Sequence, residues 1–180
     1  MNICVFCGSA VGNNDAYAEA ARALAILFSK AKHTLIYGGA DVGLMGILAD
    51  TMLEANGSVI GVIPDFLLKR EVAHRGLTKL EVVDSMHQRK QRMAELADAF
   101  IAIPGGWGTL DELAEILTWK QLGIIDKPIG ILNTNNFFDP LLNQMQNMVK
   151  EGFLKDSNLS NVWVESIPLP LVVKIERTFI

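Results

Sequence analysis

Residues 104–112, which read PGGWGTLDE, have the composition of a loop that binds phosphate. The segment follows an apolar run and precedes an amphipathic stretch, so we expect it to connect a strand to a helix. Glycines let the backbone approach an anion closely, and the free N–H groups and dipole of a helix N-terminus favour negative charge. The sequence therefore predicts a phosphate site where this helix begins.

Two further glycine-rich turns follow predicted strands. Gly8-Ser9 comes after the first strand, and Gly38-Gly39-Ala40 comes after the second. In an open parallel sheet the carboxyl ends of the strands share one edge, and ligands bind there. Three such turns at one edge are stronger evidence for an anion site than any one of them alone.

The glycine motifs typical of larger phosphate groups are absent. Gly38 and Gly43 have the spacing of GxxxxGK[ST], but Leu44 stands where that motif needs a lysine. The turn that begins at Gly8 does not match the GxGxxG of dinucleotide-binding proteins. We therefore expect a ligand with a single phosphate rather than a triphosphate or a pyrophosphate.

Short β-branched runs alternate with amphipathic stretches along the chain and must position these turns. Such alternation predicts βαβ units and a parallel sheet. The expected strands are Ile3–Cys7, Thr34–Tyr37, Ser58–Ile63, Leu80–Val83, Ala99–Ile103, Pro128–Leu132 and Val162–Glu165. The expected helices are Asp15–Ala31, Gly43–Ala55, Ser85–Leu96, one from the residue 104–112 turn to about Leu122, Phe138–Glu151, and a short one beyond Pro170. Residues 65–78 look irregular, which is typical of a substrate loop.

The predicted fold class is α/β: a single doubly wound, Rossmann-like domain over residues 1–180, with a mainly parallel sheet flanked by helices. With 180 residues, 50% of them apolar and 20% charged, the chain has ordinary globular composition. Its net charge of -4 and pI near 5.4 offer no basic face for a nucleic-acid polymer. No apolar run approaches the roughly 18 residues of a membrane helix, and the N-terminus lacks the features of a signal peptide. We therefore expect a cytoplasmic protein that binds no membrane.

The cysteines and histidines indicate neither a redox site nor a metal site. Cys4 and Cys7 form a CxxC inside an apolar strand run, where roughly 10 Å between Cα atoms is too far for a disulfide. We interpret both as core residues. The three histidines show no metal-ligand spacing, so we expect no metal. We also expect no cofactor.

Four stretches together resemble the Lonely Guy family of cytokinin riboside 5'-monophosphate phosphoribohydrolases, which older descriptions call lysine decarboxylases. They are GGADVGLMG at 38–46, GVIP at 61–64, SMHQRKQRM at 85–93 and PGGWGTLDE at 104–112. The resemblance runs from about Cys7 to Phe153. It implies hydrolysis of the N-glycosidic bond of a nucleoside 5'-monophosphate, which releases free base and ribose 5-phosphate. It also implies a homodimer with sites near the dimer interface.

By position, the resemblance implies that Arg89 and Glu112 are the catalytic pair. The residues that it implies for substrate binding are Glu71, Lys90, Gly105, Gly106, Gly108 and Thr109. To these we add Ser9 and Gly39 from the other two glycine turns. This chain departs from the family pattern at Ala40, Trp107 and Asp111, where glycine, tyrosine and glutamate are usual.

The charged candidates also have structural interpretations. Thr109 and Glu112 have the spacing of a capping box, in which the glutamate only satisfies a helix N-terminus. Arg89 and Lys90 fit a solvated helix face. Against this, a carboxylate beside an anomeric carbon can stabilise an oxocarbenium ion or activate water, and a cation can stabilise the departing base. Glu112 and Arg89 are of the right types for these two roles.

Three functions stay open at this point. The leading one is hydrolysis of cytokinin riboside 5'-monophosphates, and of AMP. The second is a general purine or pyrimidine nucleotide nucleosidase, because base preference depends on pocket walls that the sequence does not place. The third is a non-catalytic carrier of a phosphorylated cofactor, like the molybdenum-cofactor carriers that share this fold. Arg89 with Glu112 argues against the carrier, which needs only the phosphate loop.

Overall fold

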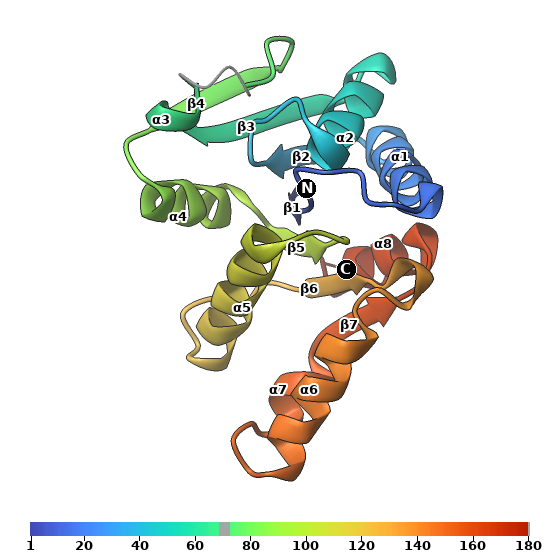
Figure 1. Cartoon of the computed structure of the whole chain (residues 1–180), viewed down its shortest axis with the longest axis vertical. Helices are drawn as coiled ribbons and strands as arrows, with labels where there is room; N and C mark the ends of the chain where they lie inside the picture. The colour runs from blue at the N-terminus through green and yellow to red at the C-terminus, as the bar shows by residue number, and fades with distance from the viewer. Residues whose placement is uncertain (69–72, 180) are drawn as a thin grey trace.

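A parallel sheet forms the centre of the computed structural model, which describes residues 1–68 and 73–179 (Figure 1). The strands are β1 Asn2–Phe6, β2 Thr34–Tyr37, β3 Ser58–Pro64, β4 Lys79–Val83, β5 Ala99–Ala102, β6 Ile129–Leu132 and β7 Val162–Glu165. Their order in the sheet is β4-β3-β2-β1-β5-β6-β7. Every neighbouring pair is parallel, as predicted.

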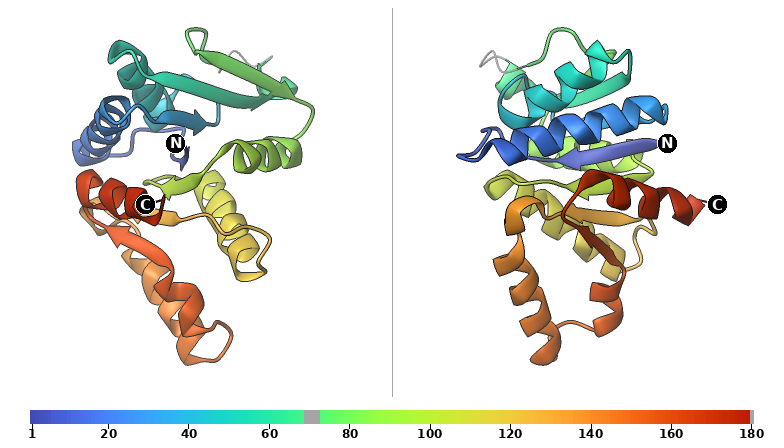
Figure 2. Two further views of the ribbon diagram at one scale, coloured as in Figure 1. Left: turned by 180° about the vertical axis from the view of Figure 1, so that it is seen from behind. Right: turned by 90° about the vertical axis from the view of Figure 1, so that its right-hand side faces the viewer.

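Helices cover both faces of this sheet (Figures 1 and 2). Those on one face are α1 Asp15–Lys30, α2 Gly43–Glu54 and α8 Pro168–Glu176. Those on the opposite face are α4 Met86–Leu96 and α5 Trp107–Gln121. The remaining helices are α3 Asp65–Leu68, η1 Thr134–Asn136, α6 Asp139–Lys150, α7 Asp156–Ser160 and η2 Arg177–Phe179. In Figure 1, α6 and α7 project away from the sheet at its β7 end.

Two apolar cores result, one on each face, because successive side chains of a strand point to opposite sides. In β1, Ile3 and Val5 belong to the core under α1, α2 and α8, whereas Cys4 and Phe6 belong to the core under α4 and α5. Strands buried on both faces are apolar without interruption, which explains the short apolar runs in the sequence. Both cysteines are free and buried, and they point into different cores.

The predicted strands are confirmed to within one residue at each end, and the doubly wound α/β prediction is confirmed with them. Among the described residues, two α-helices are not predicted by the sequence. The first is α3, which lies in the segment expected to be irregular, and the second is α7, which has five residues and too little apolar periodicity to be recognised. The last helix, α8, starts at Pro168 rather than beyond Pro170, because proline is well suited to the first turn of a helix.

The strand order places a topological switch point between β1 and β5. From β1 the chain winds outward to β4, then crosses back to β5 and winds outward to β7. The helix after β1 covers one face of the sheet and the helix after β5 covers the other. The two connections therefore diverge at the carboxyl ends of these strands, where doubly wound proteins bind ligands.

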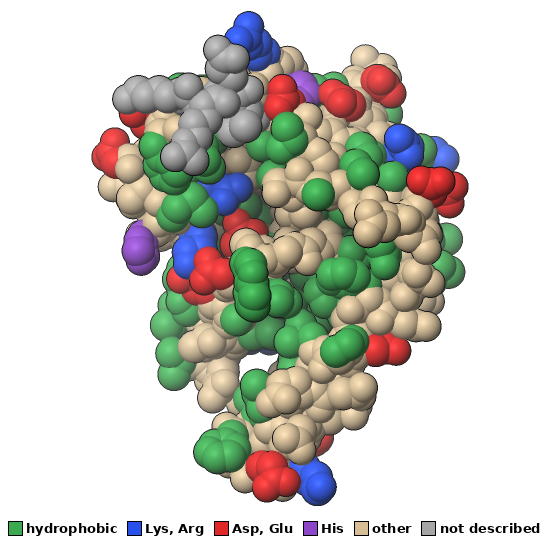
Figure 3. All heavy atoms as spheres, in the orientation of Figure 1, with side chains coloured by type: hydrophobic (Ala, Val, Ile, Leu, Met, Phe, Trp, Pro, Cys, Tyr) green, Lys and Arg blue, Asp and Glu red, His purple; other side chains and the backbone are tan. Residues whose placement is uncertain are grey.

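The surface carries charges of both signs. On the face shown in Figure 3, lysine and arginine side chains lie among aspartates and glutamates rather than in one basic patch. Within residues 1–68 and 73–179, none of the helices has the length and apolar character needed to cross a membrane. In the same residues, no three histidine, cysteine or carboxylate side chains lie close enough to hold a metal ion.

Candidate active site

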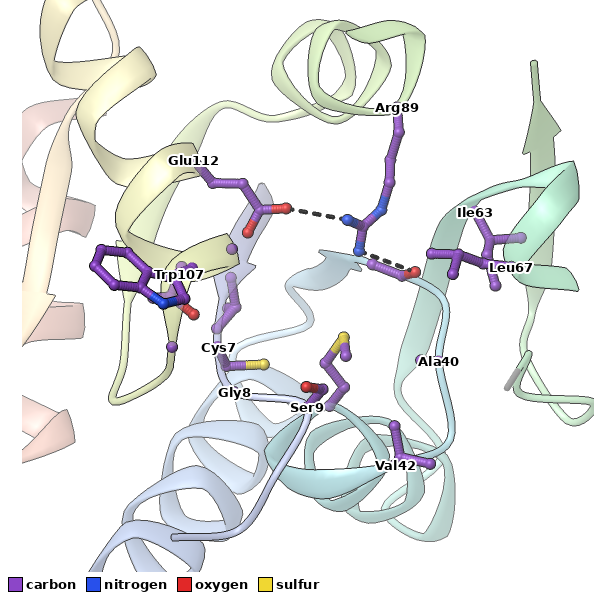
Figure 4. A pocket seen from close by; sticks show the side chains of 16 residues that line it. Cys7, Gly8, Ser9, Ala40, Val42, Ile63, Leu67, Arg89, Trp107 and Glu112 are labelled. Atoms are coloured by element: carbon purple, nitrogen blue, oxygen red, sulfur yellow. Dashed lines mark hydrogen bonds and ion pairs between the residues drawn. The ribbon is translucent and has the colours of Figure 1, made fainter. Parts of the chain in front are cut away.

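A cavity of about 350 Å³ opens at the switch point (Figure 4). We call it the switch-point pocket. Its lining residues are Val5, Cys7, Gly8, Ser9, Gly38, Ala40, Val42, Met45, Ile63, Leu67, Arg89, Gly106, Trp107, Gly108, Thr109 and Glu112. The three glycine turns that the sequence places at one edge of the sheet therefore meet around a single pocket.

Arg89, from α4, is buried in this pocket and fixed by three hydrogen bonds. Its Nε donates to the Val62 carbonyl at 3.1 Å and its Nη2 to the Gly38 carbonyl at 3.2 Å. Its Nη1 donates to Oε1 of Glu112 at 3.3 Å. Gly38 makes room for the guanidinium, because a Cβ at this position would lie 1.8 Å from Nη2. Arg89 is therefore a buried cation, and its interpretation as part of a solvated helix face is wrong.

Glu112, from α5, faces Arg89 across the pocket (Figure 4). Its side chain is also buried. Burial raises the pKa of this carboxyl from 4.5 to about 7, although the Arg89 guanidinium acts in the opposite direction. Near neutral pH the carboxyl is therefore present in both protonation states, which suits a group that gives and takes protons.

The loop before α5 ends in an open helix N-terminus. Gly106 is the N-cap, so Thr109 and Glu112 lie inside the helix, and the capping-box interpretation is wrong. The hydroxyl of Thr109 is buried and has no hydrogen-bond partner among the described residues. The first amides of a helix also lack intrahelical acceptors. This end of the pocket therefore presents unpaired N–H groups to an anion.

The other two glycine turns contribute in different ways. Ser9 lines the switch-point pocket, whereas Gly39 does not. Gly39 has a left-handed φ of 78°, and its carbonyl accepts from the His74 amide at 2.9 Å, so it shapes the turn. Ala40 lines the pocket without a left-handed φ, so replacing the usual glycine there causes no backbone strain.

Gly105 does not line the switch-point pocket, and neither does Lys90. Lys90 is beside the pocket rather than in its lining, with Nζ 3.1 Å from Oδ2 of Asp111 and 3.2 Å from Oε1 of Glu115. It thereby joins α4 to α5 next to the Arg89–Glu112 pair. Glu71 lies outside the described residues. The substrate contacts expected of these residues stay predictions.

An apolar wall faces the glycine loop across the pocket, and the sequence does not predict it. Val42, Ile63 and Leu67 lie on the side opposite Trp107 (Figure 4), and Met45 is a further apolar residue of the lining. Trp107 itself is 88% exposed, and its indole points away from the cavity. The wall residues have no signal in the sequence, because apolar residues after a strand or in a helix look like ordinary core.

The switch-point pocket thus has three chemically different parts. One end offers the unpaired amides of a helix N-terminus, the centre holds a buried carboxyl with a pKa near 7 beside a fixed cation, and the far wall is apolar. This arrangement can hold a small molecule by a phosphate at one end and an apolar group at the other. A proton can be moved at the bond between them.

Comparison with known proteins gives close relatives over most of the chain. The family described as "Possible lysine decarboxylase" matches residues 45–172. The cytokinin riboside 5'-monophosphate phosphoribohydrolase of Rhodococcoides fascians is 47% identical over 164 residues, covering 91% of this chain and 83% of that protein. The enzyme of the same name from Arabidopsis thaliana, LOG1, is 46% identical, covering 84% of this chain and 71% of its own length.

Solved structures with the same fold are more distant in sequence. The molybdenum cofactor binding protein of Rippkaea orientalis has a TM-score of 0.74 and 22% identity, covering 99% of this chain and 96% of that one. The Moco carrier protein of Chlamydomonas reinhardtii has a TM-score of 0.74 and 20% identity with the same coverage. At such identities the likeness shows the doubly wound fold alone.

Proposed function

Since the chain belongs to the Lonely Guy family of cytokinin riboside 5'-monophosphate phosphoribohydrolases, we propose that it hydrolyses the N-glycosidic bond of these nucleotides. The products are the free cytokinin base and ribose 5-phosphate. The observation that carries the proposal is the buried Arg89–Glu112 pair beside a loop with free anion donors. AMP is a second, poorer substrate.

The substrate lies with its phosphate at the start of α5. The amides of the first turn and the hydroxyl of Thr109 donate to the phosphate oxygens, and the helix dipole favours their charge. Ser9 and Gly108 border the same end of the pocket. Anchored there, the ribose lies between the glycine loop and Glu112.

Glu112 acts on the anomeric carbon. As the bond to the base breaks, the electron pair leaves with the base and the ribose gains oxocarbenium character. The carboxylate stabilises this positive charge and accepts a proton from the water that adds to the anomeric carbon. That proton is then passed to the departing base, which leaves as the neutral molecule, and Glu112 returns to its ionised form. With a pKa near 7, it is basic enough to take that proton and is ionised in half of the molecules at neutral pH.

Arg89 keeps this carboxylate in place. Two of its three hydrogen bonds go to backbone carbonyls of the Gly38 turn and of β3, so the guanidinium is fixed by the sheet edge itself. The third reaches Glu112 and favours its ionised form. Removal of Arg89 would therefore both loosen the carboxylate and make it harder to ionise.

The base lies against the apolar wall of Val42, Met45, Ile63 and Leu67. These side chains offer no hydrogen bond to the amino group of adenine, but they gain from contact with an apolar substituent on it. Isopentenyladenosine 5'-monophosphate should therefore exceed AMP in kcat/KM by roughly tenfold or more, the range that a hydrophobic pocket supplies.

We further propose that the protein is a single-domain, cytoplasmic homodimer. An apolar groove supports the dimer. We call it the α5–α6 groove, and it is lined by Leu110, Leu113, Ala114, Leu117, Thr118, Gln121, Leu141, Met145, Met148, Leu154 and Asn158. Next to it, Trp107 and Phe153 are 88% and 86% exposed. Apolar surface of this kind is typical of an interface.

The test of the activity compares three compounds. The purified protein is incubated with isopentenyladenosine 5'-monophosphate, with AMP and with isopentenyladenosine, and free base is measured by chromatography. We expect rapid release from the first, slower release from the second and almost none from the third, because the phosphate supplies binding energy used in the transition state. No release from either nucleotide would overturn the proposed function and favour a carrier.

A further inference from the structure

A second cavity of about 210 Å³ lies against the same glycine loops. We call it the Phe137 pocket, and its distinctive lining residues are Val11, Tyr17, Leu44, Pro104 and Phe137. Gly8, Ser9 and Gly106 line both this cavity and the switch-point pocket. The two cavities are therefore neighbours that adjoin at the loops after β1 and β5.

The Phe137 pocket suits an uncharged aromatic or apolar group. The rings of Tyr17 and Phe137 meet edge to face, with centroids 5.8 Å apart and planes at 77°. Phe137 is 39% exposed, so part of its ring is free to contact a ligand. None of the described residues that line this cavity carries a charged side chain. A second phosphate would therefore find no cation there.

Gly106 points to a ligand that reaches both cavities. A Cβ added to it would meet nothing within 4 Å, so crowding does not require a glycine there. Gly105 is different, because its Cβ would lie 2.1 Å from Oγ1 of Thr109. Gly106 lines both cavities, so a side chain there would reduce the space at their shared border.

The anion site lies at this meeting point. Gly106 is the N-cap of α5, so a phosphate at the first turn of that helix has the switch-point pocket on one side and the Phe137 pocket on the other. Ligands of doubly wound folds commonly extend across the switch point in this way. A substituent on the phosphate itself would enter the Phe137 pocket.

We propose that the two cavities together bind nucleoside 5'-phosphodiesters. The nucleoside occupies the switch-point pocket, the single phosphate lies at the start of α5, and an aromatic or apolar ester group occupies the Phe137 pocket. The placement of the nucleoside rests on the proposed function. The placement of the ester group rests on the second cavity and on Gly106.

The experiment compares two esters of equal charge, the phenyl and the methyl ester of AMP. Their Kd values are measured by calorimetry with the Glu112→Gln variant, in which hydrolysis is expected to be slow. We expect the phenyl ester to bind about 2- to 10-fold more tightly, which is what an edge contact between aromatic rings supplies. Equal affinity for the two esters, or tighter binding of the methyl ester, would overturn the proposal.

Three further substitutions, each added to Glu112→Gln, locate the effect. Phe137→Ala should abolish the preference for the phenyl ester and leave the Kd of the methyl ester unchanged. Val11→Asp places a charge at a half-exposed position of the same cavity and should reverse the preference. Val42→Ala, which changes only the switch-point pocket, should keep it. A preference that survives both Phe137→Ala and Val11→Asp would contradict the assignment. Because only binding is measured, a failure of base hydrolysis would leave this comparison unaffected.

Discussion

Glu112 is buried beside Arg89, yet its carboxyl pKa is raised to about 7, because lost hydration outweighs the attraction of the guanidinium. Arg89 spends two of its three hydrogen bonds on backbone carbonyls and reaches Glu112 with one. The sequence predicts this pair only through the family resemblance, because the two residues are 23 positions apart and no local pattern indicates that they are in contact. The sequence does not predict that Val42 or Ile63 lines the pocket, because an apolar pocket wall and an apolar core have the same composition.

The raised pKa makes the stability of the fold depend on pH. Between pH 4.5 and 7 the folded protein holds a proton on Glu112 that the unfolded chain has lost, so stability falls as pH rises through this window. Glu112→Gln mimics the protonated carboxyl, so the stability of the variant does not fall as pH rises through this window. We expect the variant to be no more stable than the native protein at pH 4.5, but more stable at pH 8. At about 1.4 kcal/mol per pH unit, the gain reaches roughly 3 kcal/mol.

Urea unfolding of both proteins at pH 4.5 and pH 8 measures this difference. Glu19→Gln on α1 is the matched control, because it removes an exposed carboxylate that does not act on the Glu112 pKa. If Glu112→Gln changes the free energy of unfolding equally at both pH values, burial does not keep the carboxyl neutral, and its pKa is not raised to about 7.

At the scale of elements, the glycine turns and the helix starts decide where these side chains lie. Strand and helix positions are predicted well from apolar runs, but helix starts are less reliable. Where a helix is expected to begin at Ser85, a serine three residues before a glutamine does form the N-cap, with Oγ accepting from the Gln88 amide at 3.2 Å. The same kind of signal fails at Thr109, because α5 begins two residues earlier, at Trp107, with a glycine N-cap that needs no side chain. The spacing of residue types does not distinguish these two cases.

Two glycine substitutions should separate the turns by function. Gly38→Ala would force the guanidinium of Arg89 to move, and Gly105→Ala would push against Thr109 in the phosphate loop. We therefore expect Gly38→Ala to lower kcat and Gly105→Ala mainly to raise KM, each by roughly 10- to 100-fold, as misplacement of about 1 Å can do. Steady-state kinetics with isopentenyladenosine 5'-monophosphate measures both constants, and circular dichroism checks that each variant is folded. A Gly38→Ala variant with native kcat would show that the position of Arg89 does not matter.

At the scale of the whole molecule, the doubly wound order brings three distant turns to one edge of the sheet. That arrangement is predictable, because parallel βαβ units place all carboxyl ends together. The exposure of apolar residues on the outer helices is not predictable in the same way. The residues of the α5–α6 groove follow the helical periodicity of a core, and only the structure shows that some of them, such as Ala114 and Met148, are exposed.

The proposed dimer makes a prediction at this scale. Light scattering should give a mass of about twice the 19.7 kDa of one chain. Met148→Glu, which places a charge in the α5–α6 groove at a position 38% exposed, should shift the protein to the monomer. Val82→Glu, at an exposed position of the edge strand β4, is the control and should stay dimeric. A monomeric native protein would contradict the proposed dimer, and a dimeric Met148→Glu would exclude this groove as the interface.

The most direct test of the account is the rate of base release by the native protein and by Glu112→Gln under single-turnover conditions, from pH 5.5 to pH 8.5. At pH 8 we expect Glu112→Gln to release base roughly 10² to 10⁴-fold more slowly than the native protein, because the variant lacks the group that accepts the proton. The native rate should also rise with pH through about 7, where the Glu112 carboxyl ionises, while the residual rate of the variant stays flat. A variant within twofold of the native rate, or a variant that keeps the same rise with pH, would contradict the catalytic role of Glu112.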